Sequence, residues 1–307
     1  MRRKIRMNQL LTLVSSIIIA GTISSCKKST SSLPPIGGYD NSDQVGAANL
    51  LAHWTFDGSA NESISGTAPT TSNGTSFVTG VKGQGVSMAN GYILYPSTIS
   101  KLNVASWGSV TVSLWIKVDN NGSTATSFFA LTQPTNLQGD WNQGPLNVYA
   151  ETAHPTATDD TLVLHSAFHV YSGGNYSVGG DNINDYGVRG TDFQTVHGTN
   201  QWVHYVMRYD GTQSNIDLYA DGVRVSNNNF RNRTVGNPAV GIGSFVTNPP
   251  SQVLLGAWPN SNVGYTNSAP QSWQGNLTGS IDEIRVWNTA LSESDISSLY
   301  QLELAGR

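Results

Sequence analysis

Cysteine is nearly missing from this chain, since Cys26 is the only one among 307 residues. An intrachain disulfide is therefore excluded, and the folded protein must be stabilised by its hydrophobic core. Charged residues are also scarce, at 12% of the sequence. The apolar run from Leu10 to Ala20 is shorter than the about 20 residues that a helix needs to cross a bilayer, so it is not expected to be a transmembrane span.

A net positive charge and the sequence motifs of common catalytic sites are missing as well. The chain has 16 basic and 20 acidic residues, and without residues 1–25 it would keep 12 basic and 20 acidic ones, a net charge of −8. This balance disfavours nucleic acid and anionic lipid as partners, because both are bound through clustered positive charge. The six histidines are dispersed, and no Ser-His-Asp order, cysteine nucleophile, phosphate-binding loop or histidine-rich zinc motif occurs.

The N-terminal residues have the layout of a secretory signal peptide. Four basic residues precede the apolar run: Arg2, Arg3, Lys4 and Arg6. The run is followed by Ile-Ser-Ser-Cys, which resembles the lipobox of bacterial lipoproteins and implies cleavage before Cys26 and lipidation of its thiol. The alternative is an ordinary cleavage site beside an unrelated thiol. We therefore expect a signal peptide over residues 1–25 and a cell-envelope lipoprotein at the outer membrane, with the side that it faces left open.

A tether and a single domain are expected after the signal peptide. Residues 26–47 lack periodicity and are rich in serine, proline and glycine, which is typical of a flexible linker. From there on, strand patterns alternate with turn residues, and no long helical pattern appears before residue 291. All-β sandwiches can reach about 250 residues as one domain, so residues 48–307 are expected to form one domain.

Local patterns predict strands, a hairpin and one helix. Over residues 110–118, aliphatic residues alternate with Thr111, Ser113 and Trp115, which predicts a strand with one apolar face. The dipeptide Asp221-Gly222 lies between two alternating runs and favours a type I′ turn, because both central positions of that turn need a positive φ. Ser292, with an aspartate three residues later, resembles a capping box, so a short helix is expected to follow it.

Two longer motifs lie at opposite ends of the expected domain, HWTFDGSANESISG from His53 and GSIDEIRVWNTALSESDISSLY from Gly279. Together they resemble the first and last strands of laminin-G-like domains in the concanavalin A-like lectin and glucanase superfamily. This resemblance implies an all-β jelly-roll sandwich of two antiparallel sheets, with one short C-terminal helix packed on its outside. It also implies a glycan or protein ligand, and some members of the superfamily cleave polysaccharides.

A calcium site is expected where the first and last strands meet. Asp57 ends the first strand motif, Asn61 follows in its loop, and alternation puts Asp282 on the same side of the last strand as Ile284 and Val286. A buried carboxylate must be paired, hydrogen-bonded or bound to a metal, and hard oxygen ligands suit Ca²⁺. The resemblance also implies a structural Ca²⁺ at this place. The alternative is Asp282 held by loop amides without a metal.

Aromatic residues in loops are the first candidates for a sugar site. Trp258 and Trp273 bracket a loop that also holds Tyr265. Loops commonly carry function, and an exposed aromatic ring can stack on the apolar face of a sugar. The alternative is that each of the three anchors its loop to the fold.

A polar stripe in the middle of the chain is the second candidate. Alternation puts Tyr149 and Glu151 on one face of one expected strand, and His165, His169 and Tyr171 on one face of the next. If these strands are neighbours, the five side chains line one open sheet face, where the resemblance implies polysaccharide binding. The alternative is a solvated outer face without a ligand.

The sequence favours binding over hydrolysis. Retaining glucanases hold two carboxylates about 5–5.5 Å apart, on a Glu-x-Asp-x-Glu strand in this superfamily, and no such string occurs among the five glutamates. We expect a non-catalytic, lipid-anchored polysaccharide-binding protein that works with a polysaccharide-uptake system. Two alternatives stay open. One is a lyase or glycoside hydrolase, with His165, His169, Tyr171 and Arg208 as suitable lyase groups, and the other is a protein-adhesion or scaffold module.

Overall fold

Alternation of apolar and polar side chains organises most of the described chain into strands. The computed structural model describes residues 33–153, 160–185 and 194–307. In β5 (Val110–Val118), the even-numbered residues enter the core, whereas Thr111, Ser113 and Trp115 face the opposite side, as predicted. The expected hairpin turn is also present, because Asp221 and Gly222 have φ angles of 49° and 77°.

The main sheet contains most of the strands. In spatial order its path is β12 (Val223–Arg224), β11 (Asn215–Ala220), β10 (Val203–Asp210), β5, β18 (Leu277–Trp287), β3 (Gln84–Leu94), β16 (Gln252–Leu255), β6 (Ala125–Thr132), β7 (Leu146–Ala150), β8 (Leu164–Ser172) and β9 (Asn175–Ile183). Three strands pair beside this path: β1 (Leu50–Trp54) with β18, β2 (Thr71–Thr79) with β3, and β17 (Gln274–Gly275) with β6. Two small sheets join β4 (Ser106–Gly108) to β15 (Phe245–Val246) and β13 (Thr234–Val235) to β14 (Val240–Gly241).

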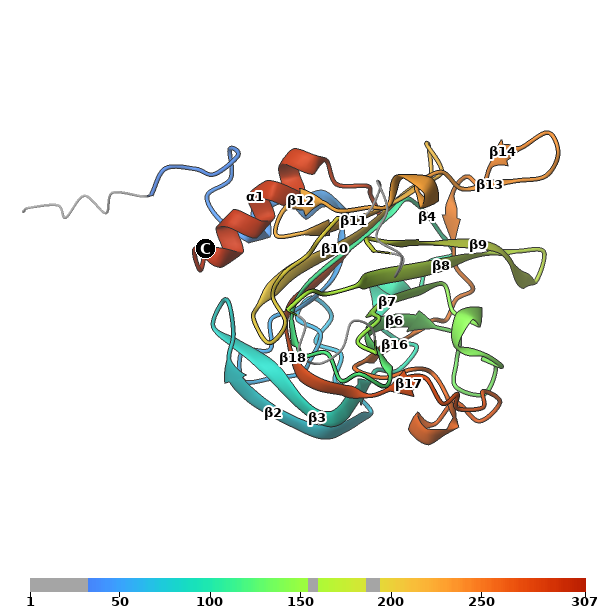
Figure 1. Cartoon of the computed structure of the whole chain (residues 1–307), viewed down its shortest axis with the longest axis horizontal. Coiled ribbons are helices and arrows are strands. Elements are labelled where there is room, and N and C mark those ends of the chain that lie inside the picture. Colours follow the sequence, from blue (N-terminus) through green and yellow to red (C-terminus); the bar gives the residue numbers. More distant parts are fainter. Residues whose placement is uncertain (1–32, 154–159, 186–193) are drawn as a thin grey trace, which may run out of the picture. The chain divides into compact units, whose positions relative to one another are not determined.

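The main sheet curls into two packed layers (Figure 1). The first layer runs from β12 to β3 and the second from β16 to β9, and a short pairing that includes Leu94 and Leu254 joins them. Core side chains of the two layers meet, since the rings of Phe168 in β8 and Tyr209 in β10 have centroids 4.3 Å apart. This is the all-β sandwich that the sequence predicts.

One α-helix occurs within the described residues, α1 (Glu293–Leu304), and it confirms the predicted C-terminal helix. Ser292 caps it by accepting a hydrogen bond from the Asp295 N–H at 3.1 Å. Ile296 and Leu299 share a buried apolar cluster with Val206 of β10. The helix α1 lies beside β10, β11 and β12 of the first layer (Figure 1). In the described part of the chain, no helix is both long enough and apolar enough to span a membrane.

Short 3₁₀ helices lie in the connections between strands. They are η1 (Ser42–Gln44), η2 (Ala47–Asn49), η3 (Ser100–Leu102), η4 (Trp141–Gln143), η5 (Asn228–Phe230) and η6 (Ser261–Val263). Of these, η6 contributes Asn262 to the polar cleft described below, and η4 follows Asp140, which accepts a hydrogen bond from Gln271 of that cleft.

The segment before β1 packs against the C-terminal residues. The Ser42 N–H donates to the carbonyl of Arg307 at 3.1 Å, and the Arg307 guanidinium donates to the carbonyl of Pro34 at 3.0 Å. Val45 is buried in the apolar cluster under α1. The predicted flexible tether over 26–47 is therefore wrong for residues 34–47, because isolated apolar residues anchor a segment whose overall composition is that of a linker. Cys26 and the expected signal peptide lie outside the described residues.

Candidate functional site

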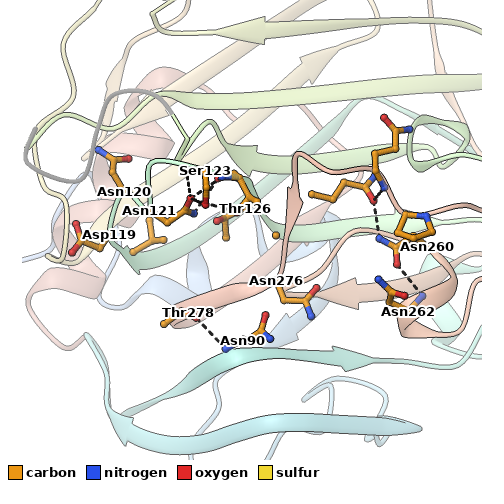
Figure 2. Close-up of a pocket in the computed structure, with 16 residues that line it drawn as sticks. Asn90, Asp119, Asn120, Asn121, Ser123, Thr126, Asn260, Asn262, Asn276 and Thr278 are labelled. Atoms are coloured by element: carbon orange, nitrogen blue, oxygen red, sulfur yellow. Dashed lines mark hydrogen bonds between the residues drawn. The ribbon is translucent and has the colours of Figure 1, made fainter.

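A polar cleft of about 570 Å³ opens where the end of β5 meets the starts of β6 and β18 (Figure 2). Eight of its sixteen lining residues carry a carboxamide and only one is charged, so the cleft is polar but almost neutral. The lining consists of Asn90, Val118, Asp119, Asn120, Asn121, Ser123, Thr124, Thr126, Asn260, Asn262, Pro270, Gln271, Gln274, Gly275, Asn276 and Thr278.

Local backbone features hold the walls of the cleft in place. Asn90 has a φ of 51° in an irregular stretch of β3, a left-handed conformation that asparagine tolerates better than most residues. Its N–H donates to the Thr278 hydroxyl at 3.1 Å, which ties β3 to β18. Asn260 caps η6 by accepting a hydrogen bond from the Asn262 N–H at 3.0 Å.

Some carboxamides of the cleft build its walls. The Asn121 Oδ1 accepts hydrogen bonds from the N–H groups of Ser123 and Thr124 at 2.8 Å and 2.7 Å. The Asn260 amide donates to the Gln274 Oε1 at 2.7 Å. These side chains use their polar atoms to shape the loops, so they are structural parts of the site.

Three other carboxamides keep their hydrogen-bonding capacity. No hydrogen bond to another described residue uses the side-chain amide of Asn90, Asn262 or Asn276. In the view of Figure 2 these three lie along the lower side of the cleft, opposite Asn120 and Asn121. None of them stands out in the sequence, because asparagine is common in turns and only the fold brings these three together.

The lining is rich in neutral hydrogen-bonding groups. Neutral amides can donate to and accept from hydroxyl groups. Asp119 carries the only carboxyl group among the sixteen lining residues, whereas glycoside hydrolysis uses a pair of carboxyl groups. The cleft therefore offers many neutral hydrogen-bonding partners and no acid–base pair.

The aromatic residues predicted to bind sugar serve mainly as anchors. Trp258 and Tyr265 are buried, with 1% and 0% of their surface exposed, so the prediction that they present their rings to a ligand is wrong. The Trp258 indole donates to the carbonyl of Ala125 at 3.0 Å, and the Tyr265 hydroxyl lies 2.8 Å from that of Thr132. Loop position suggested exposure, but large rings bury favourably wherever a neighbouring strand can cover them.

Trp273 is half-buried and connects this aromatic cluster to the cleft. Its ring packs edge-on against Trp258 and Trp141, with centroids 4.7 Å and 5.4 Å away. Its indole N–H donates to the Gln271 Oε1 at 2.6 Å. The cluster thereby supports the loop that carries the Gln271 side of the cleft.

The polar stripe predicted on β7 and β8 does lie on one outer face of the second layer. The two strands are neighbours, with Tyr149 directly opposite His165, and their rings are 4.4 Å apart. His165 bridges two carboxylates: its Nδ1 is 2.9 Å from the Glu151 Oε1, and its Nε2 is 2.9 Å from the Asp181 Oδ2. Arg233 continues the chain of charges, 3.0 Å from the other Asp181 oxygen.

Electrostatics link His165 to its two partners. Burial by itself lowers the pKa of His165, but the hydrogen bonds with Asp181 and Glu151 outweigh it and leave that pKa raised. The hydrogen bond with His165 in turn lowers the pKa of Asp181. Tyr149 is 4% exposed beneath this group, so the stripe is a set of cross-strand ion pairs over a buried ring.

The remaining stripe residues and the suggested lyase arginine do not join this group. Burial lowers the pKa of His169, which has no ion pair with a described residue. Tyr171 lies near the hairpin end, with its ring 5.4 Å from that of Tyr176. Arg208 belongs to the first layer, where it donates to Asp217 at 2.8 Å. The groups that a lyase would need are therefore not brought together.

A β-bulge moves Asp282 away from the place that simple alternation predicts. The register of β18 against β5 shifts between Asp282 and Arg285, and Glu283 has a φ of 46°. Ile284 and Val286 enter the core, whereas Asp282 is buried against the turn between β2 and β3. The prediction that Asp282 shares their side of the strand is wrong, because the extra residue of the bulge reverses the alternation.

The surroundings of Asp282 consist of amide donors. Its Oδ2 accepts hydrogen bonds from the N–H groups of Val81 and Lys82 at 2.7 Å and 3.2 Å. Its Oδ1 accepts from the N–H of Glu283 at 2.8 Å. Burial raises the pKa of Asp282 to about 7 despite these three donors. Both carboxylate oxygens are thus already used, which favours the alternative of a carboxylate held by amides.

The other two expected calcium ligands lie at the surface of the protein. Asp57 is exposed and accepts a hydrogen bond from the Gln84 N–H at 2.7 Å. Asn61 is exposed in the next loop. No group of three or more histidine, cysteine, aspartate or glutamate side chains that could hold a metal occurs in the described residues. Within the described residues, the three amide donors support the alternative that hydrogen bonds hold Asp282.

Comparison with known proteins identifies the family. The binding domain of botulinum neurotoxin DC in complex with SialylT is 10% identical, with a TM-score of 0.51, covering 84% of this chain and 52% of that one. The receptor-binding domain of botulinum neurotoxin mosaic serotype C/D is 11% identical, with a TM-score of 0.50, covering 82% of this chain and 50% of that one.

The similarity to the two botulinum neurotoxin domains concerns the fold alone, and this chain spans about half the length of each toxin chain. Domain 4 of AbnA, an extracellular arabinanase from Geobacillus stearothermophilus in complex with arabinotriose, is 20% identical, with a TM-score of 0.49, covering 82% of this chain and 98% of that one. No curated protein matches the chain. Residues 89–297 match a family model, and because this match covers more than half of the sequence, the chain belongs to the Concanavalin A-like lectin/glucanases superfamily.

Proposed function

We propose that this protein binds polysaccharide without cleaving it, as a cell-envelope lipoprotein held at the outer membrane by a lipid on Cys26. The observation that carries the proposal is the cleft with eight carboxamide side chains and a single charge. A carboxamide donates and accepts hydrogen bonds without carrying a charge, which matches a sugar hydroxyl. The unengaged amides of Asn90, Asn262 and Asn276 are the groups that a glycan would contact first.

The lining supports a neutral glycan over an anionic one. Its one charged side chain, Asp119, is acidic, and it contains no lysine or arginine. Uronate, sulfate and sialate groups are bound most strongly by charge-assisted hydrogen bonds from basic side chains. An anionic sugar in this cleft would lose solvation of its charge and gain no cationic partner.

A polysaccharide panel tests the proposed function. Residues 34–307 are suitable, because residues 34–47 are packed into the domain. We expect retention in gels that contain neutral polysaccharide, without release of product. New reducing ends would instead indicate a hydrolase, and absorbance from unsaturated uronates would indicate a lyase. Failure to bind any glycan, with tight binding to a co-expressed protein, would replace the proposal by the scaffold function.

Paired variants locate the binding to the cleft. The double variant Asn262→Ala/Asn276→Ala should weaken retention by about tenfold or more, because each lost amide hydrogen bond contributes about 0.5–1.5 kcal/mol. Asn103→Ala is the matched control, since Asn103 is exposed and lies outside the lining. Equal retention of both variants would contradict the cleft as the binding site.

The anchor is tested separately. Cys26→Ala should release the full-length protein from the membrane fraction, because no second anchor is expected from the sequence. Membrane association of this variant equal to that of the wild type would contradict lipidation at Cys26. A polysaccharide-uptake role would further predict co-purification of the lipidated protein with an envelope transport complex.

A further inference from the structure

We propose a second carbohydrate-binding site at the end of the β8–β9 hairpin, where Tyr171 and Tyr176 form an aromatic platform. The proposal rests on the proposed function, since it adds a contact for the same class of ligand. A separate cavity of about 220 Å³ lies at this place, lined among others by Gln133, Leu137, Gln143, Tyr171, Asn175 and Tyr176. It shares no lining residue with the amide-lined cleft.

The hairpin places the two tyrosines side by side. Tyr171 pairs with Tyr176 across the strands, and their ring planes make an angle of 71° with centroids 5.4 Å apart. Gly173 and Gly174 form the turn between them, with φ angles of 58° and 91° that glycine adopts without strain. Both rings are half-buried, so part of each remains available to a ligand.

The opposite wall supplies polar groups and an apolar edge. The Gln133 amide donates to the carbonyl of Gln143 at 2.9 Å, and the Gln143 Oε1 accepts from the Gly139 N–H at 2.7 Å, which holds both side chains in place. The Gln143 Nε2 and the Tyr171 hydroxyl make no hydrogen bond with any described residue. Leu137 is 55% exposed beside them.

This combination matches a pyranose ring. A sugar has an apolar face of C–H groups that packs on aromatic and aliphatic side chains, and hydroxyls around its edge that bond to amides. The cavity contains both kinds of partner and no charged residue. The class of ligand is therefore again a neutral sugar, held here by ring stacking as well as by hydrogen bonds.

One loop connects the second site to the cleft. Residues 133–143 form a wall of the second site, and the Asp140 Oδ1 in this loop accepts a hydrogen bond from the Gln271 amide of the cleft at 3.1 Å. The Asn267 amide also donates to the carbonyl of Asn136 at 2.6 Å. In Figure 1 the end of the β8–β9 hairpin projects beside this loop. A polysaccharide with many repeats can engage both sites, which raises its overall affinity through multivalency.

Calorimetric titration of residues 34–307 with neutral hexasaccharides derived from cellulose, xylan and mannan tests the proposal. For a hexasaccharide that binds, we expect two sites per wild-type chain, one in Tyr171→Ala, and one in Asn262→Ala/Asn276→Ala. Tyr171→Phe keeps the ring and should keep two sites. Leu137→Asp is a second variant, at a position that is 55% exposed, and it should also remove one site.

The outcomes separate this proposal from the proposed function. One site in the wild type, abolished by the double asparagine variant and untouched by Tyr171→Ala and Leu137→Asp, would overturn the second site and leave the proposed function standing. Absence of binding to every hexasaccharide and polysaccharide would overturn both. On polysaccharide-containing gels, Tyr171→Ala should weaken retention about tenfold or more, and unchanged retention would also overturn the second site.

Discussion

Strand β18 takes part in two polar regions of opposite character. Near its start, Asn276 and Thr278 line a neutral cleft. In its middle, Glu283 and Arg285 are fully buried in an ionic network under α1, with the Arg285 Nη2 2.5 Å from the Glu283 Oε2 and its Nε 3.0 Å from the Glu303 Oε1. The network uses its charges internally, whereas the cleft leaves neutral groups available.

The difference follows from the cost of burying each kind of group. A buried charge must be paired, because its desolvation costs several kcal/mol. His53 and Trp115 therefore add hydrogen bonds to Glu283 and Glu303, at 2.9 Å and 2.8 Å. A neutral amide at the surface keeps water as a partner and exchanges it for a ligand at little cost. The buried charges of this network are thus structural, whereas the unengaged amides of the cleft remain available to the glycan that we propose.

Removal of the Arg285 guanidinium from the buried ionic network should have the largest effect on stability. Arg285→Ala leaves Glu283 and Glu303 buried without their partner, and we expect a loss of about 3–5 kcal/mol in the free energy of unfolding, measured by urea denaturation. Arg224→Ala is the matched control, because Arg224 pairs with Glu293 at 3.2 Å where both are more than a third exposed. An exposed pair contributes at most about 1 kcal/mol. Equal losses in the two variants would contradict the structural role of the network.

Removal of the Asp282 carboxylate should have the second-largest effect on stability, because this group accepts hydrogen bonds from three backbone amides. Asp282→Ala leaves the N–H groups of Val81, Lys82 and Glu283 without this acceptor, and we expect a loss of about 3 kcal/mol. Asp57→Ala removes one exposed acceptor and should cost about 1 kcal/mol or less. The melting temperature of the wild type should not change with a chelator. A decrease that added Ca²⁺ reverses would show that a cation binds the folded state after all.

The ion pairs of His165 with Glu151 and Asp181 should have a smaller effect on the free energy of unfolding, and this effect should depend on pH. The raised pKa of His165 means that its stabilisation is complete below the unfolded pKa near 6.5 and is lost as pH rises through the folded value. The lowered pKa of Asp181 means that the stabilisation from Asp181 is lost as the pH falls through the pKa of Asp181 in the folded protein. Since the partner carboxylates are 35% and 44% exposed, solvent screening limits the effect to about 1 kcal/mol.

Chemical unfolding of His165→Gln across the pH range measures this effect. Its deficit against the wild type should be largest near pH 5–6 and should shrink toward pH 9. His169→Gln is the control. Burial lowers the pKa of His169, so the stability difference between this variant and the wild type should not change with pH above neutral pH. A deficit in His165→Gln that is constant with pH would assign it to packing against Tyr149 instead.

The cleft should show the smallest effect on stability. Asn262→Ala/Asn276→Ala removes amides that no described residue uses, and the free energy of unfolding should change by about 0.5 kcal/mol or less. Asn121→Ala removes the acceptor of its own loop and should cost about 1–2 kcal/mol. A large destabilisation by the double variant would mean that the cleft amides are structural, as the charged network is.

Local features were predictable because they depend on residues close together in the chain. Alternation predicted the two faces of β5. The dipeptide Asp221-Gly222 predicted the turn between β11 and β12, and Ser292 predicted the start of α1. The neighbouring positions of Tyr149 and His165 also followed from alternation once their strands paired. The β-bulge at Glu283 was not predictable, because nothing in the sequence of β18 requires an extra residue at this position of the strand.

The sequence by itself determined the all-β class, the single C-terminal helix and the scarcity of charge, since periodicity, capping and composition are properties of the chain alone. Only the tertiary structure decided which polar residues line the cleft. The cleft joins Asn90, residues 118–126 and residues 260–278 through long-range strand pairing. The same packing buried Trp258 and anchored residues 34–47. An asparagine in a loop and a tryptophan in a loop have the same local surroundings in the sequence, and it is distant strands that expose one and cover the other.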